Sequence, residues 1–335
     1  MLITAAKNEN FEEIKSFLPV SVSSDFESIL PYIESAESEF IQPMLGIALY
    51  ANLLAYYANN DVTGEWIGSN KAKWGELLKK VQRSIINLAY WMGFDMLNAS
   101  FDASGFHREE SESRKSLFKS QEEALRSGFR NNGFNALDKV LAYLDENLTV
   151  FPDFKTSQSY TVRKSSFVPD TISFNKIYFI DNSRLIFLKF QRFIDQAEDF
   201  EIQSLLGTSL YTRIKAEMIK DTPNADIVAL NAYIQKVVVY LAVSNGLTEL
   251  GVNITDRSIF LESQAATTDN TQVRQPVPDP VLMQMIKAAK VAAEKYTSLL
   301  KSFLAAYPLK YPEYSGQTGS VYTRDNVDKK TFWVG

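Results

Sequence analysis

Two glutamates, Glu37 and Glu198, occupy equivalent positions in two similar stretches of the chain, each directly after an alanine. Two carboxylates that converge on one cleft can act as general acid and general base, so these residues are the first candidates for chemistry. Nothing in the sequence brings them to one cleft, because each belongs to its own copy of the stretch. A helix salt bridge, a helix cap or a contact between units is a far more common use of such a residue. We therefore expect both glutamates to be structural and the protein to have no catalytic residues.

Other reactive side chains are scarce. The chain has no cysteine and one histidine, His107. This composition excludes thiolate catalysis, zinc sites built on sulfur and multi-histidine metal sites. A calcium or magnesium site made only of carboxylates would remain, but the D-x-[DN]-x-[DN]-G loop is absent, as are the P-loop, G-x-S-x-G and kinase motifs. We expect no metal, no cofactor and a surface position for His107.

Length and charge narrow the possibilities further. The chain has 335 residues, of which 45% are apolar and 22% charged, and its net charge is −5. This length predicts two domains with cores large enough to fold without disulfides. A mildly acidic chain is poorly suited to grip a phosphate backbone over a wide face. The first residues do not resemble a leader, and the longest aliphatic stretch, Val237–Val243, is too short to cross a bilayer. We expect a protein made in a cytoplasm, with no membrane partner.

An internal duplication is the clearest feature of the chain. Residues 30–54 and 191–215 align without a gap and agree at nine of 25 positions, whereas chance gives about one or two. The similarity continues through Gln82 and Gln235 to the ends of the two copies. We therefore predict two related units in head-to-tail order. The residues expected to form the structural motif of each unit are Ile33, Ala36, Glu37, Leu45, Gly46, Leu49 and Tyr50, and Ile194, Ala197, Glu198, Leu206, Gly207, Leu210 and Tyr211.

The apolar residues of this motif recur at helical spacing with one interruption near Pro43. Proline removes a hydrogen bond inside a helix but is accepted in a first turn. We therefore predict that one helix ends and another begins at about residues 41–43, and that the second copy breaks at about residue 203. Gly46 and Gly207 would then lie inside a helix, where glycine costs about 1 kcal/mol relative to alanine. The expected compensation is close approach of another backbone.

The remainder of each unit is predicted to contain a long apolar helix, a β-prone stretch that leaves the bundle and a last helix. The expected ranges are 72–97, 98–108 and 115–148 in the first copy, and 225–250, 251–263 and 280–306 in the second. The predicted fold class is mainly α: two tandem related helical bundles, each with a β-hairpin-like or extended excursion, plus an extended linker and a C-terminal arm. The predicted divisions are an N-terminal segment 1–16, a first repeat 17–154, a linker with extended or β segments 155–177, a second repeat 178–314 and an arm 315–335.

The order of elements in each unit, with its I-x-x-A-E-x-x-x-I-x-x-x-L-G-x-x-L-Y motif, resembles the head–tail connector, or adaptor, proteins of tailed bacteriophages. The residues that carry the resemblance are Ile33, Ala36, Leu45, Gly46, Leu49 and Tyr50, and the equivalent set from Ile194 to Tyr211. It covers roughly residues 26–314 and extends to larger duplicated phage and prophage proteins of Bacteroidetes. The resemblance implies a helical bundle with a projecting hairpin or loop, assembled as a ring beneath the portal, with no catalytic residues.

From this resemblance we expect a structural virion protein of the phage neck or tail region, assembled in the bacterial host cytoplasm. Its expected partners are further copies of itself in a ring, the portal and other neck or tail proteins, with phage DNA passing through the lumen without specific binding. The aromatic pair Phe332 and Trp333 in the C-terminal arm is expected to contact a partner. The alternatives are a helical protein-binding scaffold or adaptor outside any virion and, less favoured, an enzyme that uses a carboxylate pair.

Overall fold

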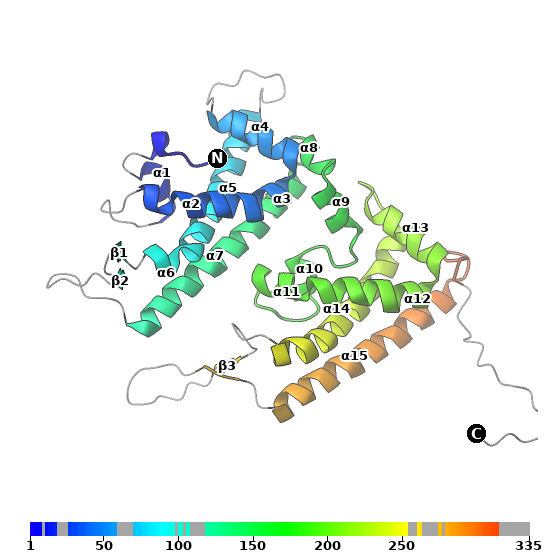
Figure 1. The fold of residues 1–335 in the computed structure, drawn as a ribbon. Coiled ribbons are helices and arrows are strands. Elements are labelled where there is room, and N and C mark those ends of the chain that lie inside the picture. The colour runs from blue at the N-terminus through cyan, green and yellow to red at the C-terminus, as the bar shows by residue number, and fades with distance from the viewer. Residues whose placement is uncertain are drawn as a thin grey trace, which may run out of the picture.

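The computed structural model describes residues 1–8, 11–18, 26–58, 70–97, 100–102, 105–107, 118–253, 260–262, 274–276 and 279–314. The described chain forms two helical units that lie side by side (Figure 1). One hydrophobic core is built from residues between Leu2 and Tyr160, and the other from residues between Phe167 and Tyr314. The predicted mainly α fold with two tandem units is confirmed.

The two units repeat the same order of long elements. The first contains η1 (Ala5–Lys7), α1 (Glu12–Lys15), α2 (Phe26–Ala36), the π-helical turn η2 (Glu37–Ile41), α3 (Gln42–Leu45), α4 (Ile47–Ala58), α5 (Lys71–Met92), α6 (Phe94–Leu97), β1 (Ser100–Asp102), β2 (Gly105–His107), α7 (Lys119–Glu146), α8 (Pro152–Lys155) and α9 (Gln158–Ser165). The second contains α10 (Thr171–Asn175), α11 (Arg184–Gln196), the π-helical turn η4 (Ala197–Ile202), α12 (Gln203–Leu206), α13 (Thr208–Met218), α14 (Ala225–Asn253), β3 (Phe260–Glu262), β4 (Arg274–Pro276) and α15 (Asp279–Ala306).

The four short strands in the described part of the chain form two separate antiparallel pairs, one in each unit. Strand β1 pairs with β2, and β3 pairs with β4. Each strand has three residues. His107 is the last residue of β2, and its side chain lies outside the part of the structure that is described.

A pair of long helices forms the centre of each core: α5 with α7 in the first unit and α14 with α15 in the second (Figure 1). The inner face of α5 has apolar side chains at helical spacing, which follows from the need of a central helix to bury its stripe. By length and composition alone, helix α14 could span a membrane over Ala225–Glu249. In the structure, 56% of this apolar stretch is buried inside the protein. The central helix of a buried core can have the same length and composition, and α14 occupies that position in the second unit.

The predicted helix break at residues 41–43 is wrong, because the chain continues there through the π-helical turn and α3. Pro43 lies in the first turn of α3, directly after the π-helical turn. The break comes at Gly46, with φ +80°, and at Gly207, with φ +78°. Only glycine adopts this backbone readily. The two glycines therefore end one helix and begin the next, instead of lying inside a helix.

Two predicted divisions of the chain also need correction. The segment 1–16 is not separate from the first unit, because Leu2, Ile3 and Ile14 are completely buried in its core. The stretch 155–177 holds α9 and α10 where extended or β segments were expected. The polar residues that suggested extended chain serve as helix caps: Ser157 and Asp170 accept hydrogen bonds from the first turns of these helices. The arm 315–335, with Phe332 and Trp333, lies outside the described residues.

Candidate functional site

Glu37 lies in the π-helical turn of the first unit, where it is buried with 2% of its surface exposed. Its Oε1 accepts a hydrogen bond of 2.6 Å from the backbone N–H of Leu2, and its Oε2 accepts one of 2.7 Å from the Tyr50 hydroxyl. The amino group of Met1 lies 3.9 Å from the same Oε2. This carboxylate therefore fixes the first residues of the chain against the core.

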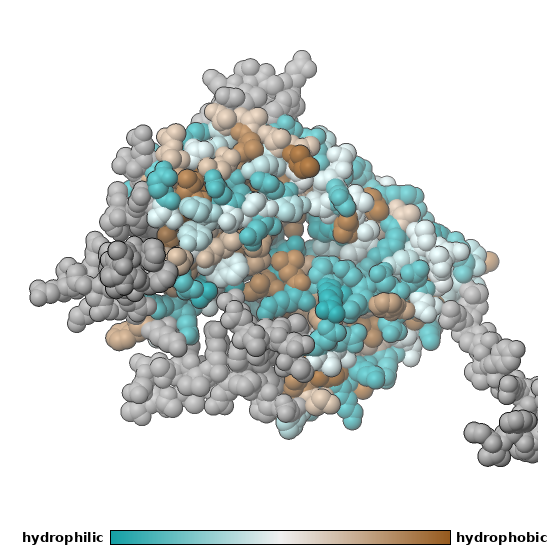
Figure 2. Space-filling view, in the orientation of Figure 1, coloured by the Kyte–Doolittle hydropathy of each residue, from teal (hydrophilic) through white to brown (hydrophobic). Residues whose placement is uncertain are grey.

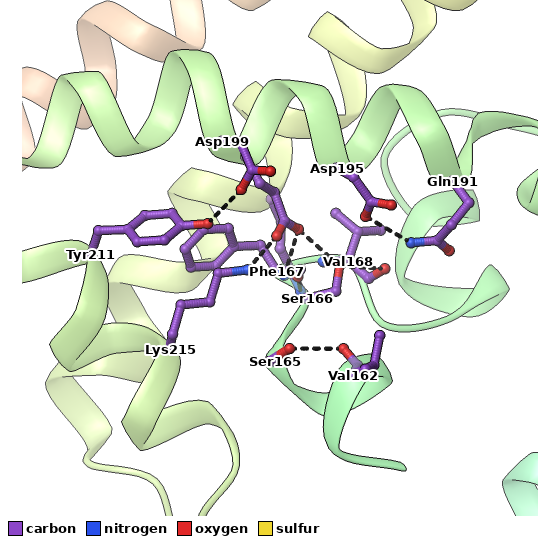
Figure 3. A network of polar contacts seen from close by, with 12 residues as sticks. Val162, Ser165, Ser166, Phe167, Val168, Gln191, Asp195, Asp199, Tyr211 and Lys215 are labelled. Carbon is purple, nitrogen blue, oxygen red and sulfur yellow. Dashed lines mark hydrogen bonds and ion pairs between the residues drawn. The ribbon is translucent and has the colours of Figure 1, made fainter. Parts of the chain in front are cut away.

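Glu198 holds the equivalent place in the second unit. Its Oε1 accepts hydrogen bonds of 2.7 Å from the backbone N–H of Phe167 and 2.8 Å from the Ser166 hydroxyl (Figure 3). Its Oε2 is ion-paired with the ammonium group of Lys215. Glu198 thus fixes the segment that enters the second unit, just as Glu37 fixes the segment that enters the first.

A glutamine completes each arrangement from the neighbouring long helix. Gln82 on α5 donates to the carbonyl of Leu2 at 2.8 Å, and Gln235 on α14 donates to the carbonyl of Phe167 at 2.8 Å. The glutamate therefore binds the N–H, and the glutamine the C=O, of one residue whose side chain is fully buried. We call each such pair a Glu–Gln clamp: Glu37 with Gln82, and Glu198 with Gln235. Buried backbone groups need such partners, because an unpaired one costs free energy comparable to a lost hydrogen bond.

The third partner of the glutamate differs between the two clamps. In the first it is Tyr50, and burial together with the Glu37 carboxylate raises the pKa of this phenol to about 12. In the second it is Lys215, while Tyr211 donates instead to Asp199 at 3.3 Å. Burial raises the pKa of Glu198 above its ordinary value, and the ion pair with Lys215 opposes that shift. The two clamps therefore share their geometry but differ in the side chain that meets the second carboxylate oxygen.

These surroundings show what the two glutamates can do chemically. They lie in separate cores, and each carboxylate is occupied by hydrogen bonds from its own unit. The two carboxylates therefore do not meet in one cleft. Nothing in the sequence indicated that they would. Among the described residues no group of three or more His, Asp or Glu side chains is arranged to hold a metal ion.

The other motif residues form the core around the clamps. Their apolar members are buried in both units: Ile33, Ala36, Leu45 and Leu49, and Ile194, Ala197, Leu206 and Leu210. Gly46 and Gly207 form the breaks between the short and the following helices. The motif therefore shapes the turn that brings each glutamate to its backbone partner.

A second candidate site is the contact between the units. The last long helix of the first unit, α7, packs against the first long helix of the second, α11. Arg184 on α11 lies 3.2 Å from the Asp138 carboxylate on α7, and its backbone N–H donates to Asn135. Burial raises the pKa of Asp138 and lowers that of Arg184, while their mutual attraction opposes both shifts. On the outer side, Lys155 and Asp221 join the units through an exposed ion pair of 2.7 Å.

A family model matches two segments of the chain, residues 41–164 and 202–324. The chain belongs to DUF6712, a family of unknown function. Each DUF6712 segment covers most of one structural unit, so the tandem duplication is confirmed. No curated protein and no solved structure matches the chain.

The two structural units enclose a groove of about 660 Å³ at their junction. Apolar side chains from both units line it, including Met44 and Leu141 from the first and Leu188 from the second. Two arginines, Arg163 and Arg184, also reach it. Figure 2 shows hydrophobic side chains gathered at the centre of this face, over the junction. The groove therefore joins apolar surface of the two units.

The two residues whose backbone the clamps bind, Leu2 and Phe167, are not predicted from the sequence. Leu2 and Phe167 lie before the recognisable repeats, and the glutamines were matched without an assigned role. The available signal was the apolar pairs Leu2-Ile3 and Phe167-Val168, each of which precedes its repeat. Because these pairs are short and lie at different distances from the repeats, alignment alone did not connect them.

Proposed function

We propose that this DUF6712 protein is a non-catalytic structural subunit that assembles into a homo-oligomeric ring at the portal–tail junction of a tailed bacteriophage. The resemblance to head–tail connectors supports this proposal, and the residues that carry it form the core and turns of each unit. The two carboxylates with the greatest catalytic potential are used as backbone clamps. The protein's role is then to hold neighbours in place.

The observation that carries the proposal is the way in which the two units meet. Helix α7 of the first unit packs against α11 of the second. In the repeat, α7 corresponds to α15 and α11 corresponds to α2, so the two helices in contact are not equivalent to each other. The contact therefore joins two different faces of the same building block. Such a heterologous contact generates a ring when its rotation closes, unlike the self-complementary contact of a two-fold dimer.

The same mode of contact between copies would bring opposite charges together. Leu141 on α7 and Leu188 on α11 both line the groove between the units. Their repeat equivalents are Lys301, 160 residues later, and Glu27, 161 residues earlier, and both are exposed. A contact between copies would place Lys301 of one copy opposite Glu27 of the next. Two apolar residues that line the junction within the chain would thus correspond to two opposite charges at the contact between chains.

Other parts of the chain are assigned to assembly within this proposal. The β1–β2 and β3–β4 pairs are the excursions that contact the portal or other neck and tail proteins. Phe332 and Trp333 anchor the arm to a partner, because aromatic side chains give large contact area at small entropic cost. The net charge of −5 keeps the ring from gripping the DNA that passes through it.

Charge reversal tests the proposal. We expect mass photometry of the purified chain with its portal protein to show one large oligomer. Lys301→Glu and Glu27→Lys should each weaken that oligomer, and the double variant should restore it. Lys287→Glu, on the distant half of α15, is the matched control and should have no effect. A wild-type chain that stays monomeric with and without the portal would contradict the ring.

The groove supports a second candidate, a protein-binding adaptor outside any virion. Its apolar walls suit a short peptide with apolar anchors. Pull-down from the native host distinguishes the two functions. Recovery of capsid or tail components supports the ring subunit, whereas recovery of a peptide-bearing host protein, lost in Leu188→Asp, supports the adaptor.

A further inference from the structure

The break at Gly46 in the first unit is covered by the segment that follows the last helix. A Cβ atom on Gly46 would lie only 2.8 Å from the Cβ of Ser157. Two residues further on, the Ser159 hydroxyl donates to the backbone carbonyl of Met44 at 2.9 Å. The start of α9 is therefore seated directly on the turn that Gly46 makes.

The equivalent break in the second unit has the same backbone but no such cover among the described residues. Gly207 has φ +78°, and no described atom outside its own immediate surroundings lies within 4 Å of the position where its Cβ would be. The following residue, Thr208, is exposed. The second unit has thus kept the turn at Gly207, and we call this exposed turn the seat. The described part of the chain ends at Tyr314.

The path from the last helix to this seat is the same in both units. In the first, Asn52 on α4 donates to Asp153 at 2.7 Å, which ties the turn after α7 to α4. In the second, Arg213 on α13 binds Glu313 at 2.9 Å and ties the turn after α15 to α13. Arg213 is 161 residues after Asn52, and Glu313 is 160 residues after Asp153. The chain therefore leaves the second unit beside the helix that begins at Gly207.

The residues that come next resemble those that cover Gly46. The family match ends at residue 164 in the first unit and at residue 324 in the second, so it includes the stretch equivalent to α9. Ser157, Ser159 and Arg163 of the first unit correspond to Thr318, Ser320 and Arg324 at a spacing of 161 residues, one more than the spacing between Asp153 and Glu313. Thr318 is a good helix N-cap, like Ser157.

We propose that residues 318–324 of the same chain dock on the Gly207 break. Thr318 then covers Gly207, and the Ser320 hydroxyl binds the carbonyl of Leu205, the equivalent of Met44. The four residues from Tyr314 to Thr318 span up to about 13 Å. The segment that covers Gly46 follows its last helix in the same chain, which assigns the seat to the chain's own tail. This inference does not depend on the ring, because it concerns one chain.

Cross-linking tests the seat, because the natural chain has no cysteine. The test variants are Leu205→Cys with Ser320→Cys and, at more exposed positions, Thr208→Cys with Thr318→Cys. Each full-length variant is treated with a short bis-maleimide, and the cross-linked peptides are measured by mass spectrometry. Met44→Cys with Ser159→Cys is the positive control, and Leu205→Cys with Lys287→Cys is the negative control.

We expect both test pairs to cross-link within the monomer band at a yield as high as that of the positive control. A yield no higher than that of the negative control would overturn the proposal. A product found only at the mass of two chains would also overturn it, since the occupant would then be a second copy. Oligomer size is measured separately, so a failure here leaves the ring proposal to its own test.

Discussion

Replacing Gln82 by leucine probes the Glu–Gln clamp of the first unit most sharply. Leucine keeps most of the side-chain volume but removes the N–H that the Leu2 carbonyl accepts at 2.8 Å. Gln82 is 4% exposed and Leu2 is fully buried, so water cannot replace the lost donor. An unsatisfied buried carbonyl costs about 1–3 kcal/mol, and we expect Gln82→Leu to lower the free energy of unfolding of the first unit by that amount.

With Trp333 of the arm replaced by phenylalanine in every protein compared, tryptophan fluorescence during urea denaturation measures this loss in the first unit alone. Trp66, Trp74 and Trp91 belong to the first unit, and residues 155–314 contain no tryptophan. Gln235→Leu is the matched control: it removes the equivalent hydrogen bond in the second unit, so it should leave the tryptophan transition unchanged. If Gln82→Leu shifts the free energy of unfolding by less than about 0.5 kcal/mol, as an ordinary surface change does, the clamp is not a stabilising element.

Three further predictions concern charge and backbone. Burial raises the pKa of Glu198 above its ordinary 4.5, so the folded state holds the proton more tightly and wild-type stability falls as pH rises from 4.5 through the raised pKa. Glu198→Gln should lack this fall in denaturation series followed by circular dichroism, and parallel curves for the two proteins would refute the assignment. Gly46→Ala and Gly207→Ala should each cost about 1–3 kcal/mol in thermal unfolding, because the positive φ is strained for any side chain; an unchanged melting temperature would contradict this. Arg184→Ala should cost about 1–3 kcal/mol by leaving Asp138 without its partner in the contact between the units. The exposed pair of Arg192 with Glu249 is its control, and an equal effect of Arg192→Ala would show that the buried position is unimportant.

Much of the architecture could be predicted because it depends on periodic burial. The long helices at residues 71–92 and 225–253 were expected from their apolar stripes, and the duplication was readable as identical residues at a constant spacing. The break was misplaced because proline is a strong local signal. The actual turn depends on a positive φ at Gly46, and sequence alone does not reveal this φ.

The clamp could be predicted only in part. That Glu37 and Glu198 recur was visible, and a structural role was the expected one. Their partners are backbone groups of Leu2 and Phe167, far away in the sequence, and a backbone N–H carries no residue-specific signal. The same reason explains the misread stretch 155–177, where Ser157 and Asp170 act as caps through contacts that composition does not specify.

Negative-stain electron microscopy of the purified wild-type chain with its portal protein shows directly whether copies of the chain close into a ring. We expect closed rings in which each copy meets the next through two different faces. Isolated monomers at every concentration, or dimers related by a two-fold axis, would contradict it.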